Sequence, residues 1–217
     1  MKNLIVQIYV DTKKYTNTNL LPSFDELSKT SFILAKHYAK KIGAEYLLLT
    51  DTYINYIHPT YERLRLFEES SWTNDYDQVL YLDSDVFIYQ DSPDIFKMYP
   101  DLDKFKVCTH WDVVRYGIAD DGGFNAGVFM LNKYSRNQML PYLKYRFDVP
   151  LQHHDNAALV NCVKASEVKT QYMDARFNAK NNGPWFCHAW GLGKRRIPIM
   201  DCVRIAQEQA ELVNRLN

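Results

Sequence analysis

The chain has no net charge, because its 26 Lys and Arg residues balance its 26 Asp and Glu residues. Proteins that bind nucleic acids or anionic membranes carry an excess of basic residues, so we expect neither kind of partner. No apolar run approaches the roughly 20 residues of a membrane span, and the N-terminus shows no signal-peptide pattern. We therefore expect a cytoplasmic protein with no transmembrane segment. The sequence leaves open whether the 217 residues are a whole protein or one domain of a larger one.

Cysteine is scarce, and no two cysteines are close in sequence. The four residues are Cys108, Cys162, Cys187 and Cys202, with no C-x-x-C pair. Zinc sites and redox pairs usually depend on such close spacing, so the pattern favours reduced thiols over disulfides or a zinc site. Internal repeats, low-complexity segments and linkers are also missing. The length then fits one domain spanning residues 1–217.

Short apolar runs alternate with helical patterns along the chain. Strands are predicted at residues 4–10, 45–49, 79–82, 106–109 and 124–131, and two short ones at 168–172 and 186–188. Helices are predicted at residues 23–43, 61–69, 135–147, 155–164 and 201–216. This alternation predicts an α/β domain with a mostly parallel central sheet flanked by helices.

Local signals set the expected helix ends. Ser23 and Glu26 form a capping-box pattern, and Gly43 is a plausible C-terminal stop. Ser92 followed by proline predicts a helix start. Pro141 is expected to kink or divide the helix at residues 135–147, because proline cannot donate the helical hydrogen bond.

Three Asp-x-Asp triplets occur, and only one ends a buried strand. The triplets at residues 75–77 and 101–103 stand in polar, turn-like sequence, where solvated carboxylates are expected. Asp83 and Asp85 instead follow the apolar run at residues 79–82. Two neighbouring carboxylates at such a place repel each other and are costly to desolvate. A divalent cation with oxygen ligands relieves both problems and can hold a substrate phosphate. Ligands bind beyond the carboxyl ends of the strands in such sheets.

Five segments, in order along the chain, resemble a known family. They are residues 61–64 (YERL), 81–86 (YLDSDV), 124–128 (FNAGV), 155–159 (DNAAL) and 188–194 (HAWGLGK). Together they are similar to motifs of glycosyltransferases with the GT-A fold, and especially to family eight, the group of glycogenin and the bacterial lipopolysaccharide galactosyltransferases. Two departures are Asn156, where glutamine is usual, and the arginines that replace Pro-Trp after Lys194.

The resemblance implies a set of site residues. Asp83, Asp85 and His188 are expected to hold Mn²⁺ or Mg²⁺, an imidazole being an acceptable third ligand. Asp155 and Asn156 are expected to lie near the anomeric carbon as the catalytic residues. The residues expected to bind the UDP-sugar are Tyr9, Val10, Asp11, Arg63, Asp83, Ser84, Asn125, Ala126, Gly191 and Lys194. Within that set, glycine allows close approach to a phosphate and lysine supplies a point charge.

The implied function is metal-dependent transfer of a hexose-type sugar from a UDP-sugar to a glycan or other hydroxyl acceptor, with retention of anomeric configuration. The donor would bind in the half at about residues 1–110, and the acceptor in the half at about 111–217. Two routes to retention remain open. Asp155 acts as a nucleophile, or the acceptor attacks on the leaving-group face while Asn156 and the phosphate steady the anomeric centre. The sugar, the acceptor and the oligomeric state are not specified by the sequence.

Two other functions are compatible with the carboxylate pair. A phosphatase of the haloacid dehalogenase type also has Asp-x-Asp after an apolar strand. That motif expects Thr or Val where this chain has Phe87, and it usually lies near the N-terminus. A non-catalytic domain that binds a sugar nucleotide is the other alternative, distinguished by donor binding without turnover on any acceptor.

Overall fold

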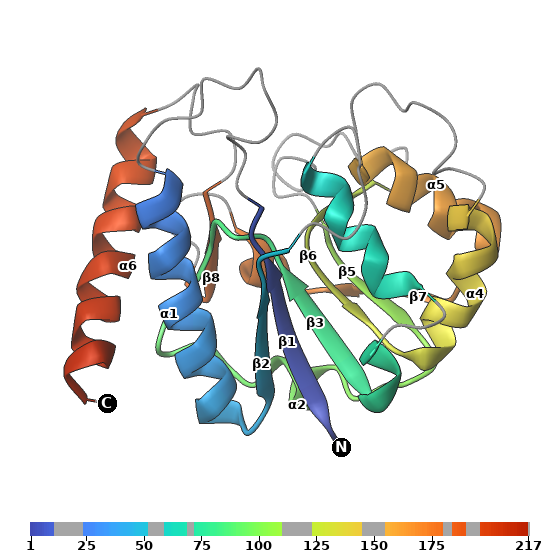
Figure 1. The fold of residues 1–217 in the computed structure, drawn as a ribbon, viewed down its shortest axis with the longest axis horizontal. Coiled ribbons are helices and arrows are strands. Elements are labelled where there is room, and N and C mark those ends of the chain that lie inside the picture. Colours follow the sequence, from blue (N-terminus) through green and yellow to red (C-terminus); the bar gives the residue numbers. More distant parts are fainter. Residues whose placement is uncertain are drawn as a thin grey trace.

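A six-stranded sheet forms the centre of the computed structural model (Figure 1). The structure describes residues 1–10, 24–51, 59–68, 72–109, 123–144, 155–179, 184–189 and 196–216. The strands of the sheet are β1 (Asn3–Ile8), β2 (Glu45–Leu49), β3 (Gln78–Leu82), β5 (Phe105–Thr109), β6 (Phe124–Leu131) and β7 (Thr170–Met173). Their order across the sheet is β2-β1-β3-β6-β5-β7.

The sheet is mostly parallel, with one strand reversed. β2, β1 and β3 run parallel to one another, as do β5 and β7. β6 lies between β3 and β5 and pairs antiparallel with both. The predicted α/β fold with a mostly parallel sheet flanked by helices is therefore confirmed. The reversal of β6 was not predicted, because an apolar run does not reveal the direction of its strand.

Helices cover both faces of the sheet. One face packs against η2 (Pro59–Phe67), α4 (Lys133–Lys144) and α5 (Asp155–Ser166). The other packs against α1 (Phe24–Ile42), α2 (Ile95–Met98) and η4 (Ala175–Asn178). A second, two-stranded sheet of β4 (Val86–Ile88) and β8 (Phe186–His188) adjoins α1. The long helix α6 (Arg196–Leu216) lies along the outside of α1 (Figure 1). The short turn η3 (Trp72–Asp75) precedes β3.

The ends and inward face of α1 follow from its sequence. The predicted apolar face is buried, with Leu27, Leu34, Ala35 and Tyr38 all nearly inaccessible. Gly43 ends the helix with a φ of 72°, a conformation that glycine adopts at no steric cost. The N–H of Ala44 then donates to the carbonyl of Ala39 at 2.9 Å, which is the Schellman arrangement. The predicted stop is confirmed, whereas the predicted cap at Ser23 lies outside the described residues.

One local prediction is wrong in part and another is wrong. Pro141 does not divide α4, which continues to Lys144, because Met139 and Leu143 on either side of the proline are fully buried in the core. Ser92 does not cap the next helix. Asp94 caps α2 instead, accepting hydrogen bonds from the first backbone N–H groups of that helix.

The cysteines differ from one another. Cys108 and Cys162 are buried thiols that form no disulfide, as predicted. Burial raises the pKa of the Cys108 thiol well above its usual value, so this thiol stays protonated and acts as a small apolar side chain. Cys187 is disulfide-bonded, so the prediction of reduced thiols is wrong for this residue. Within the described ranges, no helix has both the length and the apolar character needed to cross a membrane.

Candidate active site

The site begins where β3 ends. All five residues of β3 are buried, and the next residue, Asp83, extends the pairing by donating its N–H to the carbonyl of Gly127 at 2.8 Å. The chain then turns, closed by a 3.1 Å hydrogen bond from the N–H of Val86 to the carbonyl of Asp83. Ser84 occupies the middle of this turn and is partly buried. The turn therefore presents Asp83 and Asp85 at the carboxyl end of a central strand, as predicted.

Two buried side chains fix the backbone of the turn. The Nε2 of Gln7, on β1, donates to the carbonyl of Asp83 at 3.1 Å and to the Oγ of Ser31 at 2.8 Å. Ser31, on α1, donates in turn to the carbonyl of Val86. Both Gln7 and Ser31 are fully buried. Since buried carbonyls need partners, this pair satisfies both ends of the turn and holds it rigid.

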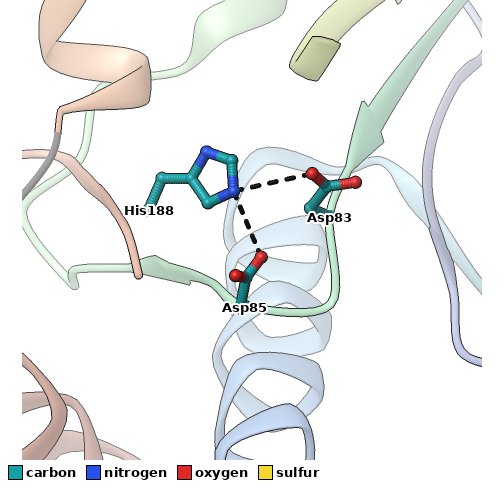
Figure 2. A group of neighbouring side chains, drawn as sticks. All are labelled: Asp83, Asp85 and His188. Carbon is teal, nitrogen blue, oxygen red and sulfur yellow. Dashed lines mark ion pairs between the residues drawn. The ribbon is translucent and has the colours of Figure 1, made fainter. Parts of the chain in front are cut away.

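His188 reaches the turn through the second sheet. β8 pairs antiparallel with β4 so that His188 lies opposite Val86, and the N–H of Ala189 donates to the carbonyl of Asp85 at 3.0 Å. The Nε2 of His188 is then 3.2 Å from Oδ1 of Asp85 and 3.5 Å from Oδ2 of Asp83 (Figure 2). The structure thus brings together the three residues predicted as metal ligands.

A guanidinium and a hydroxyl hold one oxygen of the Asp83 carboxylate. A guanidinium nitrogen of Arg63 is 3.0 Å from Oδ1 of Asp83, and the hydroxyl of Tyr81 donates to the same oxygen at 2.7 Å. The other terminal nitrogen of Arg63 donates to the carbonyl of Ala126 at 2.6 Å. Arg63 is buried, so it is not a surface arginine. In this structure it orients Asp83 and the backbone of β6.

The side chains of Asp83, Asp85 and His188 all have shifted pKa values. Burial raises the pKa of Asp83 above its ordinary value, and the nearby Arg63 offsets this only in part. Burial acts on Asp85 too, but the charge of His188 holds the pKa of Asp85 below its ordinary value. In spite of burial, the same pairing raises the pKa of His188. The positive groups therefore offset the desolvation of Asp85 fully and that of Asp83 only in part.

These residues fit a divalent cation. Their oxygen and nitrogen ligand atoms all lie within 4.8 Å of one another. Two neighbouring ligands of an octahedral ion with bonds of about 2.1 Å are about 3.0 Å apart, close to the 3.2 and 3.5 Å from the imidazole to the two carboxylates. Side chains of Asp83 and Asp85 are 20% and 14% exposed, so the group remains open to a ligand. Carboxylate ligands suit Mg²⁺ and Mn²⁺.

A bulge in β6 supplies another wall of the site. The register between β5 and β6 shifts between Val107, opposite Phe129, and Cys108, opposite Asn125. The intervening β6 residues therefore have no partner on β5, which is typical of bulges beside active sites. Gly127 lies in this segment, and a Cβ there would stand 2.1 Å from Cε1 of His188. Only glycine leaves room for the imidazole at this position.

Three of the residues predicted to bind the donor or act in catalysis meet at the bulge: Asn125, Ala126 and Asn156. Oδ1 of Asn125 accepts from the N–H of Gly127 at 2.8 Å, so its Nδ2 is the atom left to donate to a ligand. Oδ1 of Asn156 accepts from the N–H of Ala126 at 2.6 Å. The bulge would otherwise leave that backbone donor without a partner. Asp155 is the first residue of α5, and its side chain lies outside the described part.

Two more of the residues predicted to bind the donor lie just after the end of β1. Tyr9 and Val10 directly follow β1, and the N–H of Tyr9 donates to the carbonyl of Leu49 at 2.8 Å. This is the same end of the sheet at which β3 meets the turn, because β1 and β3 are parallel. The predicted residues outside the described ranges are Asp11, Gly191 and Lys194.

Sequence reasoning missed four residues that hold the site. Gln7 and Ser31 were missed because nothing in a sequence pairs a strand with a distant helix. Tyr81 precedes Asp83 by two residues and shares its side of the strand, which is a signal that could have found it. Asn178 contacts His188 and lies in a segment with no distinctive pattern.

No family model matches the chain, and neither does any curated protein. Solved structures do match. A glycosyltransferase involved in the glycosylation of the major capsid of PBCV-1 superposes with a TM-score of 0.64 at 12% identity, covering 94% of this chain and 100% of that one. The galactosyltransferase LgtC, in complex with donor and acceptor sugar analogs, superposes with a TM-score of 0.58 at 18% identity, covering 96% and 95%. At such identities the likeness concerns the fold, and this chain has the fold of the GT-A glycosyltransferases.

Proposed function

We propose that the protein is a metal-dependent glycosyltransferase that moves a hexose-type sugar from a UDP-sugar to a hydroxyl of a glycan or other acceptor. The observation that supports this most strongly is the convergence of Asp83, Asp85 and His188 at the carboxyl end of β3 within this fold. The three residues come from two separate parts of the chain. They meet where ligands bind in open α/β sheets.

Bound there, a divalent cation supplies positive charge to the donor diphosphate as the bond between sugar and phosphate breaks. The residues of the chain prepare the site for this. Arg63 and Tyr81 hold one oxygen of Asp83 and leave the other facing His188. Because these contacts exist before any donor arrives, little reorganisation is needed at the moment of reaction.

The sugar would lie against the bulge of β6 and the start of α5. Nδ2 of Asn125 is placed to donate to a hydroxyl or a phosphate oxygen. Oδ1 of Asn156 is already bonded to the backbone of Ala126, which fits a residue that steadies the sugar better than one that attacks it. Retention of configuration, with Asp155 as the alternative nucleophile, is part of this proposal, as is a contribution of Lys194 to the diphosphate.

The test is calorimetric titration with UDP, with and without Mn²⁺. The wild type is expected to bind UDP much more tightly with Mn²⁺. Asp85→Asn is expected to weaken that binding at least ~100-fold, because changes merely next to a metal ligand already cost 10–100-fold. Donors that bind are then offered acceptors, and the anomeric configuration of the product is read by NMR.

Asp103→Asn is the matched control. Asp103 belongs to another Asp-x-Asp triplet, is half exposed and pairs with Lys169 at 3.1 Å. This variant should bind UDP as the wild type does. Absence of UDP binding with and without Mn²⁺ would reject the proposal, and release of phosphate from simple phosphoesters would favour the phosphatase alternative. Binding of UDP-sugars without turnover on any acceptor would favour a non-catalytic domain.

A further inference from the structure

The second ring nitrogen of His188 has its own partner. Nδ1 lies 2.8 Å from Oδ1 of Asn178, and both side chains are buried. An amide oxygen can only accept a hydrogen bond. Nδ1 must therefore carry the hydrogen, which leaves the lone pair of the neutral imidazole on Nε2, the nitrogen that faces Asp83 and Asp85.

The direction of this hydrogen bond is fixed by a chain of contacts that ends on the backbone. The N–H of Gly127 can only donate, and it does so at 2.8 Å to Oδ1 of Asn125. That oxygen also faces Nδ2 of Asn178 at 3.2 Å. Since Asn178 turns its NH₂ group toward Asn125, its oxygen must face His188. One backbone donor thus sets the orientation of two amides and, through them, the tautomer of the imidazole.

Backbone pairing holds Asn178 in register with His188. Asn178 ends η4, which Asp174 caps by accepting from the N–H of Arg176 at 2.9 Å. The next residue, Ala179, forms a parallel bridge with Cys187. The N–H of His188 donates to the carbonyl of Ala179 at 2.9 Å. This pairing holds the backbones that carry the two side chains next to each other.

We propose that Asn178, supported by Asn125, is a positioning residue that fixes the ring orientation and tautomer of His188 so that Nε2 offers its lone pair to the cation. The proposal rests on the metal site of the proposed function. It assigns to Asn178 no contact with substrate. It gives Asn125 a second role, since the oxygen of its amide orients Asn178 while its NH₂ group remains for the donor.

The tautomer is measured first, by NMR of protein labelled with ¹⁵N-histidine, without metal and at alkaline pH where the imidazole is neutral. The wild type is expected to show hydrogen on Nδ1 of His188. Asn178→Leu removes the acceptor and should move the hydrogen partly or wholly to Nε2. Asn178→Asp keeps an oxygen facing Nδ1 and should restore the wild-type tautomer.

Cation binding is measured next, by electron paramagnetic resonance of free Mn²⁺. Asn178→Leu is expected to weaken Mn²⁺ binding about 10–100-fold, the usual cost of removing a partner of a metal-binding histidine. Asn178→Asp should recover most of the affinity. The control is Asn132→Leu, which removes another buried asparagine, one that caps α4 through Ser135. It should lower stability while leaving the His188 signals and Mn²⁺ affinity unchanged.

The outcomes separate this proposal from the proposed function. Hydrogen on Nε2 in the wild type, or an unchanged tautomer and Mn²⁺ affinity in Asn178→Leu, would overturn the role of Asn178. The expected tautomers in a protein that binds no Mn²⁺ would support the positioning of His188 and would count against the metal site itself.

Discussion

Gly127→Ala offers the sharpest test of how tightly the site is packed. The added Cβ would stand 2.1 Å from Cε1 of His188, 2.7 Å from its Nδ1 and 2.8 Å from Oδ1 of Asn125. Ordinary contact begins at 3.4 Å, so the imidazole must move by about 1.3 Å or the bulge of β6 must open. Neither is easy, because His188 is only 2% exposed and its N–H and Nδ1 are both hydrogen-bonded.

The expected loss follows from that displacement. A shift of the ring by about 1 Å takes Nε2 of His188 out of line with the two carboxylates, so Mn²⁺ affinity should fall at least ~10–100-fold. Overpacking should also lower the free energy of unfolding by about 1–3 kcal/mol. For a domain of this size, that corresponds to a fall in Tm of roughly 2–12 °C. Calorimetric titration with Mn²⁺ and thermal denaturation measure the two effects separately.

Val128→Ile is the matched control, because it adds one carbon to the neighbouring residue of the same strand. Val128 is fully buried in the core that contains Leu80 and Leu82, so its variant should lose stability and keep Mn²⁺ affinity. The reasoning is refuted if Gly127→Ala binds Mn²⁺ as tightly as the wild type, since the imidazole would then not need the space that glycine leaves.

Three other variants test the surroundings of the site. Arg63→Met removes the buried guanidinium that pairs with Asp83 and should lower the unfolding free energy by about 3–5 kcal/mol in urea denaturation; a change below about 0.5 kcal/mol would contradict this. Gln7→Leu removes the group that donates to the carbonyl of Asp83 and to Ser31. It should lower the unfolding free energy by about 1–3 kcal/mol in the same assay, and it should weaken Mn²⁺ binding. Burial lowers the pKa of Lys106 to about 8, so the unfolded chain binds more protons between about pH 8 and 10.5 and wild-type stability should rise by ~1–3 kcal/mol across that window. Lys106→Met should abolish this extra rise, as measured by urea denaturation at pH 7.5 and 10.

Much of the fold could be predicted because the local spacing of apolar residues indicates each strand and helix. The apolar runs gave β2 and β8 at their observed bounds and β3 within its observed run. Apolar spacing likewise identified the buried face of α1. Apolar spacing does not reveal the direction of a strand or the residues that an element packs against. The reversed β6 depends on partners distant in sequence, and the uninterrupted α4 depends on core packing that outweighs the preference of Pro141.

The site, too, could be predicted only in part. The ligand group at Asp83, Asp85 and His188 could be predicted. Two carboxylates that end an apolar strand need a positive charge to offset their repulsion and desolvation, and the motif resemblance identified His188 as the third ligand. The contacts that hold this group could not. Gln7 and Asn178 act through geometry that only the folded chain creates, and an isolated glutamine or asparagine in a sequence carries no signal of what it will face.

A common feature of the site is that its polar side chains are held by backbone groups. The turn of Asp83 is held through its carbonyl by Gln7, and Asn156 is held by the N–H of Ala126. The orientation of His188 is set through Asn178 by the N–H of Gly127. Backbone groups cannot change rotamer, so a site built on them keeps its geometry without a ligand. The bulge in β6 makes the last two of these contacts possible, because it releases the N–H groups of Ala126 and Gly127 from β5 at the place where Asn156 and Asn125 need partners.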